Sequence, residues 1–108
     1  MKIIINTTNA ESLKAKIIKD ARDGNLKTWE YRSNKNDVFI THSPEQWVDK
    51  VILVFTPSKD NTTLIIQPNY WKGKSEPSDE DNGIIMGRFA ERLWTQYRGE
   101  FESFESFR

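Results

Sequence analysis

The sequence predicts an α+β domain in which a mostly antiparallel, five-stranded sheet packs against helices, in the order β-α-β-β-β-β-α. Three observations predict this class. Two segments place apolar residues at helical spacing behind capping residues, several short segments are rich in β-branched and aromatic residues, and polar turns join two pairs of those segments. With 108 residues, the chain is expected to form a single domain over residues 1–108.

The first two elements are a strand over residues 2–6 and a helix that begins near Thr8. Thr8 and Glu11 have the spacing of a capping box, in which each side chain binds a backbone N–H group that the helix leaves free. Gly24 stands where a helix commonly ends in a left-handed residue. The apolar face of this helix consists of Ala10, Leu13, Ile17, Ile18 and Ala21.

The segments that follow predict a β-hairpin. Residues 26–32 alternate well enough for one strand, and residues 38–42 supply the return strand across the polar turn 33–37. In residues 43–46 a serine precedes a proline, and a glutamine follows three residues after the serine. This pattern predicts one helical turn that ends near Trp47.

A second hairpin, with strands over residues 50–56 and 62–70, is apolar on both faces near its middle. Strands of this kind need cover on two sides. If both helices pack on one side, Ile52, Val54 and Ile65 lack cover unless the connection before the hairpin reaches them. An uncovered apolar face indicates a partner, a ligand or a second copy of the chain.

Ser78 and the acidic residues after it begin a long C-terminal helix, which we expect over residues 79–104 and across one face of the sheet. Such a helix measures about 39 Å, whereas strands of five to eight residues reach only about 17 to 27 Å. Its end should overhang the sheet. Phe104, together with Phe107 in the tail, would then contact a helix of a second copy, the alternative being a frayed tail.

Gly83 and Gly87 lie four residues apart inside the predicted helix, where each costs about 1 kcal/mol relative to alanine. We expect a compensating reason for them. Close approach of the helix to the sheet is one interpretation, and exposed backbone N–H groups near an anion are the other.

The composition excludes several classes of protein. Sixteen basic and sixteen acidic residues cancel, so no global field attracts nucleic acid or an anionic membrane. The absence of cysteine excludes disulfides and zinc–thiolate sites and fits a reducing compartment. The apolar start of the chain is too short for a signal peptide or a membrane span. We therefore expect a cytoplasmic protein that does not bind a membrane.

The order of the elements resembles the repeat unit of TATA-binding proteins and the helix-grip folds, in which a long C-terminal helix lies across a curved antiparallel sheet. This resemblance rests on topology, so it implies a fold and carries no function with it. The stretches Thr-His-Ser-Pro-Glu-Gln-Trp at 41–47 and Trp-Lys-Gly-Lys at 71–74 also resemble short bacterial proteins that have no assigned activity.

Candidate catalytic residues are sparse. His42 is the only histidine, and its neighbour Ser43 would point to the opposite face of a strand, which makes a nucleophile–base pair awkward. The simpler interpretation is that His42 ends a strand while Ser43 caps the following turn. Glu45 and Asp49 match no recognised metal-ligand spacing with His42. The sequence therefore predicts no catalytic residue, no metal ligand and no cofactor.

The segment 70–74 is the best local candidate for contact with a ligand. Trp71 could stack on a base or a sugar, and Lys72 and Lys74 could meet phosphate. The simpler interpretation is a strand end with Trp71 packed under the last helix and both lysines in water.

These features favour a non-enzymatic binding or regulatory module that self-associates, for example as a homodimer, or docks another protein. The uncovered sheet face or the C-terminal helix would make the contact. The expected contact residues are Ile52, Val54, Ile65 and Trp71, followed by Phe104 and Phe107.

Two alternatives stay open. A nucleic-acid-binding domain would use Trp71, Lys72 and Lys74, and its binding would be strongest at low salt. A helix-grip cavity would enclose a small apolar ligand between the long helix and the sheet, among residues such as Trp29, Leu53 and Leu93.

Overall fold

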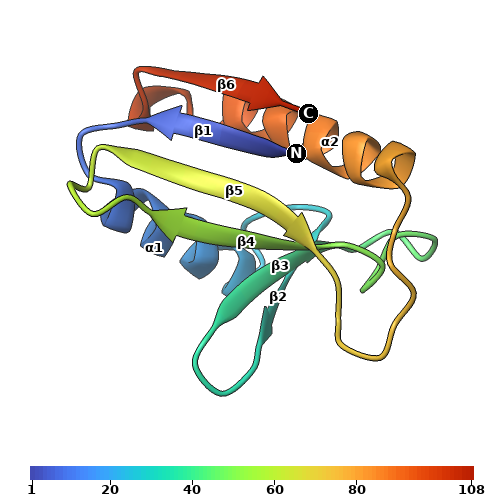
Figure 1. The fold of residues 1–108 in the computed structure, drawn as a ribbon. Coiled ribbons are helices and arrows are strands. Elements are labelled where there is room, and N and C mark those ends of the chain that lie inside the picture. The colour runs from blue at the N-terminus through green and yellow to red at the C-terminus, as the bar shows by residue number, and fades with distance from the viewer.

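The computed structural model describes residues 1–108 and has two layers, a six-stranded sheet and two α-helices (Figure 1). The strand order is β2-β3-β4-β5-β1-β6, and every neighbouring pair is antiparallel. The predicted α+β class is confirmed, with six strands in place of five. Neither helix is long and apolar enough to cross a membrane. The elements are β1 (Lys2–Asn6), α1 (Ala10–Arg22), β2 (Trp29–Ser33), β3 (Val38–His42), β4 (Ile52–Pro57), β5 (Thr63–Asn69), α2 (Asp79–Gln96), the 3₁₀ turn η1 (Arg98–Glu100) and β6 (Ser103–Phe107).

The C-terminal segment is the main departure from the sequence-based expectation. The helix α2 ends at Gln96, and the chain turns through η1 and returns as β6. In Figure 1 this last strand lies beside β1 at one edge of the sheet. The predicted helix over residues 79–104 and its overhang are therefore wrong, and the same segment supplies the sixth strand.

The aromatic spacing of the tail favours a helix, and pairing with β1 overrides it. Phe101, Phe104 and Phe107 recur every three residues, which fits the helical period and not the two-residue period of a strand. The strand form gives the outer backbone groups of β1 hydrogen-bonding partners that a helix cannot offer. In β6, Phe104 and Phe107 point to opposite faces of the sheet.

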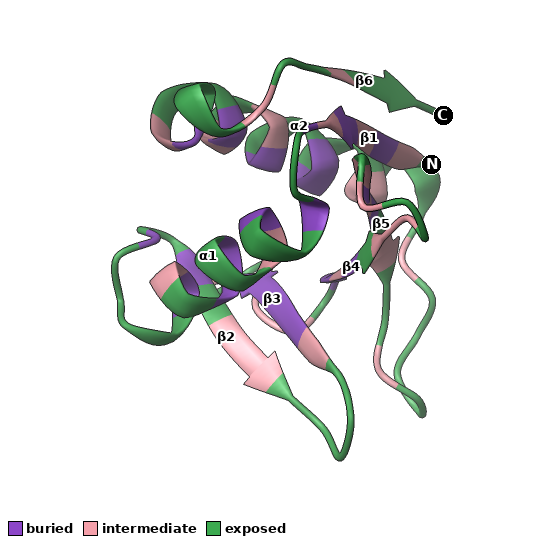
Figure 2. Cartoon of the chain, turned by 90° about the vertical axis from the view of Figure 1, so that its left-hand side faces the viewer, coloured by how far each residue is buried: buried purple, intermediate pink, exposed green.

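Both helices pack on the same face of the sheet. The Phe89 ring of α2 lies 5.2 Å from the Trp29 ring and 5.8 Å from the Phe55 ring, measured between centroids. The helix α1 lies against β2, β3, β4 and β5. Figure 2 shows the two helices on one side of the strands. The fully buried residues of this layer include Ile3, Ile5, Ile17, Ile40, Leu53, Leu64, Ile66, Ile85, Phe89 and Leu93.

Two element boundaries differ from the predicted ones for local reasons. The cap of α1 is Asn9, one residue after Thr8, because the Asn9 Oδ1 atom accepts a hydrogen bond from the Ser12 backbone N–H at 3.0 Å. The strand β2 begins at Trp29, because Thr28 adopts a φ of 67°, which an extended strand does not permit.

Close packing of α2 on the sheet does not explain Gly83 and Gly87. A Cβ atom at Gly87 would meet nothing within 4 Å, and one at Gly83 would meet only Met1 Cε at 3.9 Å. Both residues have ordinary helical φ values, since the glycines with positive φ are Gly24 and Gly73. The interpretation that these glycines permit close approach is therefore wrong.

We expect Gly87→Ala to raise the free energy of unfolding by about 1 kcal/mol, because alanine restricts the unfolded chain and clashes with nothing in the helix. Urea denaturation followed by circular dichroism measures the change. Gly73→Ala is the matched control and should be destabilising, because its φ of 87° suits glycine alone. A loss of stability in Gly87→Ala would show that space beside α2 is needed for packing.

The end of α2 is joined to α1 by a partly buried hydrogen bond, in which the Tyr97 hydroxyl donates to Asp20 Oδ2 at 2.8 Å. Burial and the neighbouring Asp20 carboxylate raise the pKa of the Tyr97 phenol, so it stays protonated as a donor. Tyr97→Phe should lower the free energy of unfolding by about 1 to 2 kcal/mol in urea titrations. Tyr70→Phe should leave it unchanged, because the Tyr70 side chain is exposed and its hydroxyl makes no hydrogen bond in the protein.

Candidate functional site

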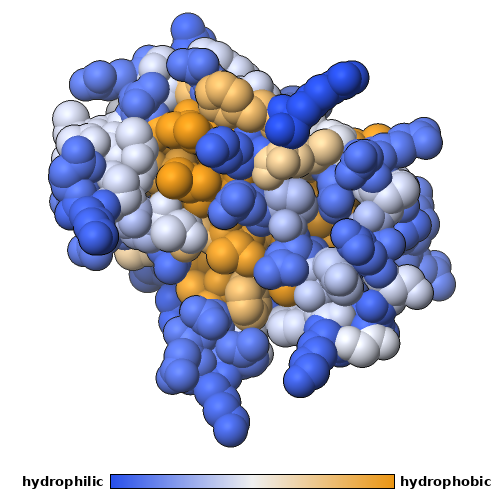
Figure 3. Space-filling model, in the orientation of Figure 1, coloured by the Kyte–Doolittle hydropathy of each residue, from blue (hydrophilic) through white to orange (hydrophobic).

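The face of the sheet opposite the helices carries a row of apolar side chains that crosses four strands. Ile4 of β1 lies directly opposite Ile65 of β5, and Val54 of β4 lies directly opposite Phe39 of β3. The register of β4 with β5 makes Ile65 and Val54 diagonal neighbours. The Trp71 ring then meets the Phe39 ring edge to face, with centroids 5.4 Å apart. We call these five residues the apolar stripe, and Figure 3 shows hydrophobic side chains gathered over the middle of this face.

The members of the apolar stripe differ in exposure. Ile4, Val54, Ile65 and Trp71 are half-buried, so part of each side chain is available for contact, whereas Phe39 is buried. Of the sheet residues expected to lack cover, Val54 and Ile65 are thus accessible. Ile52 is not, because only 3% of its surface is exposed.

Trp47, in the connection between β3 and β4, does not cover the apolar stripe. Trp47 belongs to the core on the helix side, where the guanidinium carbon of Arg88 lies 5.4 Å from its ring centroid. The predicted helical turn does form, since the Val48 backbone N–H donates to the Pro44 carbonyl at 3.0 Å.

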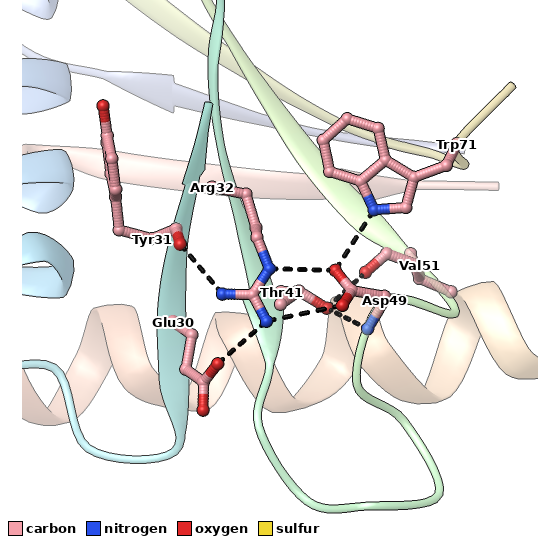
Figure 4. A network of polar contacts seen from close by, with 7 residues as sticks. All are labelled: Glu30, Tyr31, Arg32, Thr41, Asp49, Val51 and Trp71. Carbon is pink, nitrogen blue, oxygen red and sulfur yellow. Dashed lines mark hydrogen bonds and ion pairs between the residues drawn. The ribbon is translucent and has the colours of Figure 1, made fainter. Parts of the chain in front are cut away.

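A polar network borders the stripe at its β2 end (Figure 4). Arg32 Nε donates to Asp49 Oδ1 at 3.0 Å, and Trp71 Nε1 donates to the same oxygen at 3.1 Å. Arg32 also donates through Nη2 to Glu30 Oε2 at 2.9 Å and through Nη1 to the Tyr31 carbonyl at 3.0 Å. These contacts fix the Trp71 indole over Phe39 and leave its N–H group without capacity for a ligand.

Asp49 is positioned by its own backbone as well as by its side chain. Its φ of 58° lies in the left-handed region, and its N–H group donates to Thr41 Oγ1 at 2.9 Å. The Thr41 hydroxyl in turn donates to the Val51 carbonyl at 3.1 Å. Partial burial raises the pKa of Asp49, but hydrogen bonds from Arg32 and Trp71 outweigh it, so the pKa lies below its ordinary value.

The Asp49 carboxylate is occupied by these donors, and no group of three or more His, Asp or Glu side chains is arranged to hold a metal ion. Alternation along β1 and β3 could have identified Ile4 and Phe39 as members of the stripe. No pattern in the sequence links Arg32 to Asp49, because a loop brings the two together across 17 positions.

The remaining candidate contact residues lie in separate places. Lys72 and Lys74 are exposed in a turn with Gly73, beside the polar network. Phe104 packs on the helix side, 5.2 Å from the Trp94 ring, and Phe107 lies on the open face with Lys2 Nζ 5.9 Å from its ring centroid. The structure therefore brings Val54, Ile65 and Trp71 together, and it separates Phe104 from them.

The residues considered for an apolar ligand cavity fill the core instead. Trp29, Leu53 and Leu93 are all buried in one hydrophobic cluster. A hollow of about 660 Å³ lies elsewhere, between α2 and the β1–β6 edge, and Gly83 and Gly87 are part of its wall. Its lining mixes methionine, isoleucine and phenylalanine with charged side chains, so it does not form a closed apolar cavity.

We expect Asp49→Asn to lower the free energy of unfolding at neutral pH by about 1 kcal/mol, since it weakens the contacts with Arg32 and Trp71. The pKa of Asp49 is lowered in the folded state. Its contribution to the free energy of unfolding is therefore present above the unfolded pKa of about 3.9 and is lost as the pH falls further. Urea titrations between about pH 5 and pH 2 should thus show a smaller acid-induced loss of stability in the variant.

Asp37→Asn is the matched control for this pH series. Asp37 is exposed in the β2–β3 turn, and its side chain makes no hydrogen bond. The free energy of unfolding of this variant should depend on pH in the same way as that of the wild type. An Asp49→Asn variant with the same acid dependence as the wild type would contradict the role given to the network.

The comparisons with known proteins leave the fold and this surface as the basis for any functional conclusion. The chain matches no protein-family model, and no curated protein or solved structure is detectably similar to it.

Proposed function

We propose that this chain is a non-enzymatic binding module that associates with a second copy of itself through the open face of the sheet. The observation that carries the proposal is the apolar stripe on the face that neither helix covers. Domains built from a sheet normally bury both faces when both are apolar. A second sheet packed face to face at about 10 Å would cover the stripe.

The size of the face is compatible with a reversible dimer. Six strands spaced about 4.8 Å apart span roughly 24 Å between the two edge strands, and strands of five to seven residues span roughly 17 to 23 Å. Two such faces would bury roughly 800 to 1,100 Å² in total, at the lower limit of specific interfaces. A weak dimer is therefore expected, with dissociation in the micromolar range or above.

The charge distribution also favours a second copy. The stripe is bordered by residues of both signs, among them Lys2 and Glu105 at one end and Arg32 and Asp49 at the other. A two-fold axis through the face places the same patch against itself, and the net charge of zero causes no overall repulsion between copies.

The open face is a better contact surface than either edge strand. At the β2 edge, the Arg32 side chain lies along the strand and bonds Glu30 and the Tyr31 carbonyl. The other edge strand, β6, carries Glu105 at its centre. Charged side chains at sheet edges oppose the addition of further strands.

Ile65→Lys should weaken self-association, because it places a charge in the middle of the contact. Sedimentation velocity over a concentration series should show the wild type moving toward the dimer, while the dissociation constant of the variant rises at least about tenfold. Circular dichroism checks that the variant is folded.

Ile84→Lys is the matched control, because Ile84 is an exposed isoleucine on α2, outside the sheet. It should associate like the wild type. Equal weakening by both substitutions would argue against the stripe as the contact. A wild-type chain that stays monomeric up to about 1 mM would exclude self-association and leave a different protein as the partner of the same face.

A further inference from the structure

A second surface feature lies on the helix side of the sheet, away from the apolar stripe. It is a hollow of about 390 Å³, where α2 passes the ends of β2 and β3. His42, Arg88 and Arg92 contribute to its lining, together with the backbone bend at Thr28. Its wall is mainly polar, unlike the stripe on the opposite face.

The hydrogen bonds of His42 define its protonation. Its Nδ1 atom lies 2.8 Å from the Thr28 carbonyl, which can only accept, so Nδ1 carries the proton. The other ring nitrogen, Nε2, lies 3.2 Å from Arg88 Nη1, which can only donate. Both partners therefore favour the neutral ring, in which Nδ1–H donates to Thr28 and the Nε2 lone pair accepts from Arg88.

The backbone of Thr28, whose carbonyl accepts from His42, is in a strained conformation. Its φ of 67° is unusual for a β-branched residue and strains the backbone. In this conformation its carbonyl accepts from the Ser43 backbone N–H at 2.7 Å as well as from His42. Residues kept in strained conformations by surrounding contacts concentrate at functional sites.

Two arginines of α2 line the hollow without a carboxylate partner. Arg88 and Arg92 lie one helical turn apart, and every ion pair of the chain involves other residues. Like charges at this spacing destabilise a helix. Arg88 is held in place by the Trp47 ring and by His42. Glu91 also lines the hollow, but it pairs with neither arginine.

We propose that this hollow binds the phosphate group of a small molecule, with Arg88 and Arg92 as the charged ligands and His42 as a further hydrogen-bonding group. Two guanidinium groups suit a dianion, and their N–H groups match phosphate oxygens in pairs. A carboxylate offers only two oxygens to these donors, whereas a phosphate group offers at least three. Thr28, whose side chain carries a hydroxyl, also lines the hollow. The hollow has more room than a free phosphate ion needs.

Phosphate binding would be linked to a proton on His42. In the free protein, burial lowers the pKa of His42, and the charges of Arg88 and Arg92 lower it further, whereas the bond to the Thr28 carbonyl raises it. Glu91 on α2 is the acidic residue in the lining. A bound dianion offsets both arginines, so the pKa of His42 should rise and Nε2 should become a donor to the phosphate.

The test is a titration of the ¹⁵N-labelled chain with inorganic phosphate, followed through the imidazole nitrogens of its single histidine. We expect saturable shifts of both nitrogen signals and a rise in the pKa of His42. Arg92→Gln should weaken binding at least about tenfold. Arg98→Gln removes the same charge from an exposed position outside the hollow and should leave binding unchanged. Arg88→Gln serves as the second variant if Arg92→Gln does not fold.

The other outcomes are equally decisive. Absence of any shift up to about 10 mM phosphate, or equal weakening by Arg92→Gln and Arg98→Gln, would overturn the proposal. Equal binding of acetate and phosphate would also overturn it. Glycerol 3-phosphate binding more tightly than inorganic phosphate would identify an organic phosphomonoester as the ligand, and the reverse order would identify the free ion. Because His42 and Ile65 lie on opposite faces, Ile65→Lys should not alter either result.

Discussion

The structure depends on a single apolar layer between one face of the sheet and two helices. Phe89 on α2 contacts the rings of Trp29 and Phe55 on this face, and α1 covers the strands from β2 to β5. Most of the hydrophobic burial is concentrated there, with Ile3 and Ile66 inaccessible to solvent. The opposite face must then be stabilised by smaller means, which are the cross-strand contacts of the apolar stripe and the polar network beside it.

Two polar arrangements, one on each face, are organised by residues in the left-handed region of backbone space. On the open face, Asp49 has a φ of 58° and receives hydrogen bonds from Arg32 and Trp71. On the helix side, Thr28 has a φ of 67° and directs its carbonyl at His42. In both cases the unusual backbone is maintained by hydrogen bonds from distant segments, so each arrangement forms only in the completed fold.

Local patterns predicted most of the fold. The helix near Ala10, both hairpins and the two-sided hydrophobicity around Val54 could be predicted because each depends on neighbouring residues. The sixth strand could not, because the three-residue spacing of Phe101, Phe104 and Phe107 favours a helix, and the strand forms through pairing with a segment about a hundred positions away.

The candidate sites also differ in how far local sequence patterns predict them. Ile65 and Val54 could be identified as surface candidates from alternation, but the burial of Ile52 could not, because Ile52 and Val54 occupy equivalent positions in the alternation of β4. The environment of His42 could not be predicted either. Its partners Thr28 and Arg88 are 14 and 46 positions away, and only the tertiary fold brings them to its two nitrogens.

The pairing of β6 with β1 also has a kinetic consequence. Lys2 lies opposite Phe107, so the pairing of the sixth strand brings together residues about a hundred positions apart in the sequence. Closing so long a loop is entropically costly and contributes to slow folding in topologies with many non-local contacts. During synthesis on the ribosome, the edge of β1 that pairs with β6 would stay without hydrogen-bonding partners until residue 103 had emerged. In that interval the nascent chain would be most exposed to association through the isoleucines of its first strand.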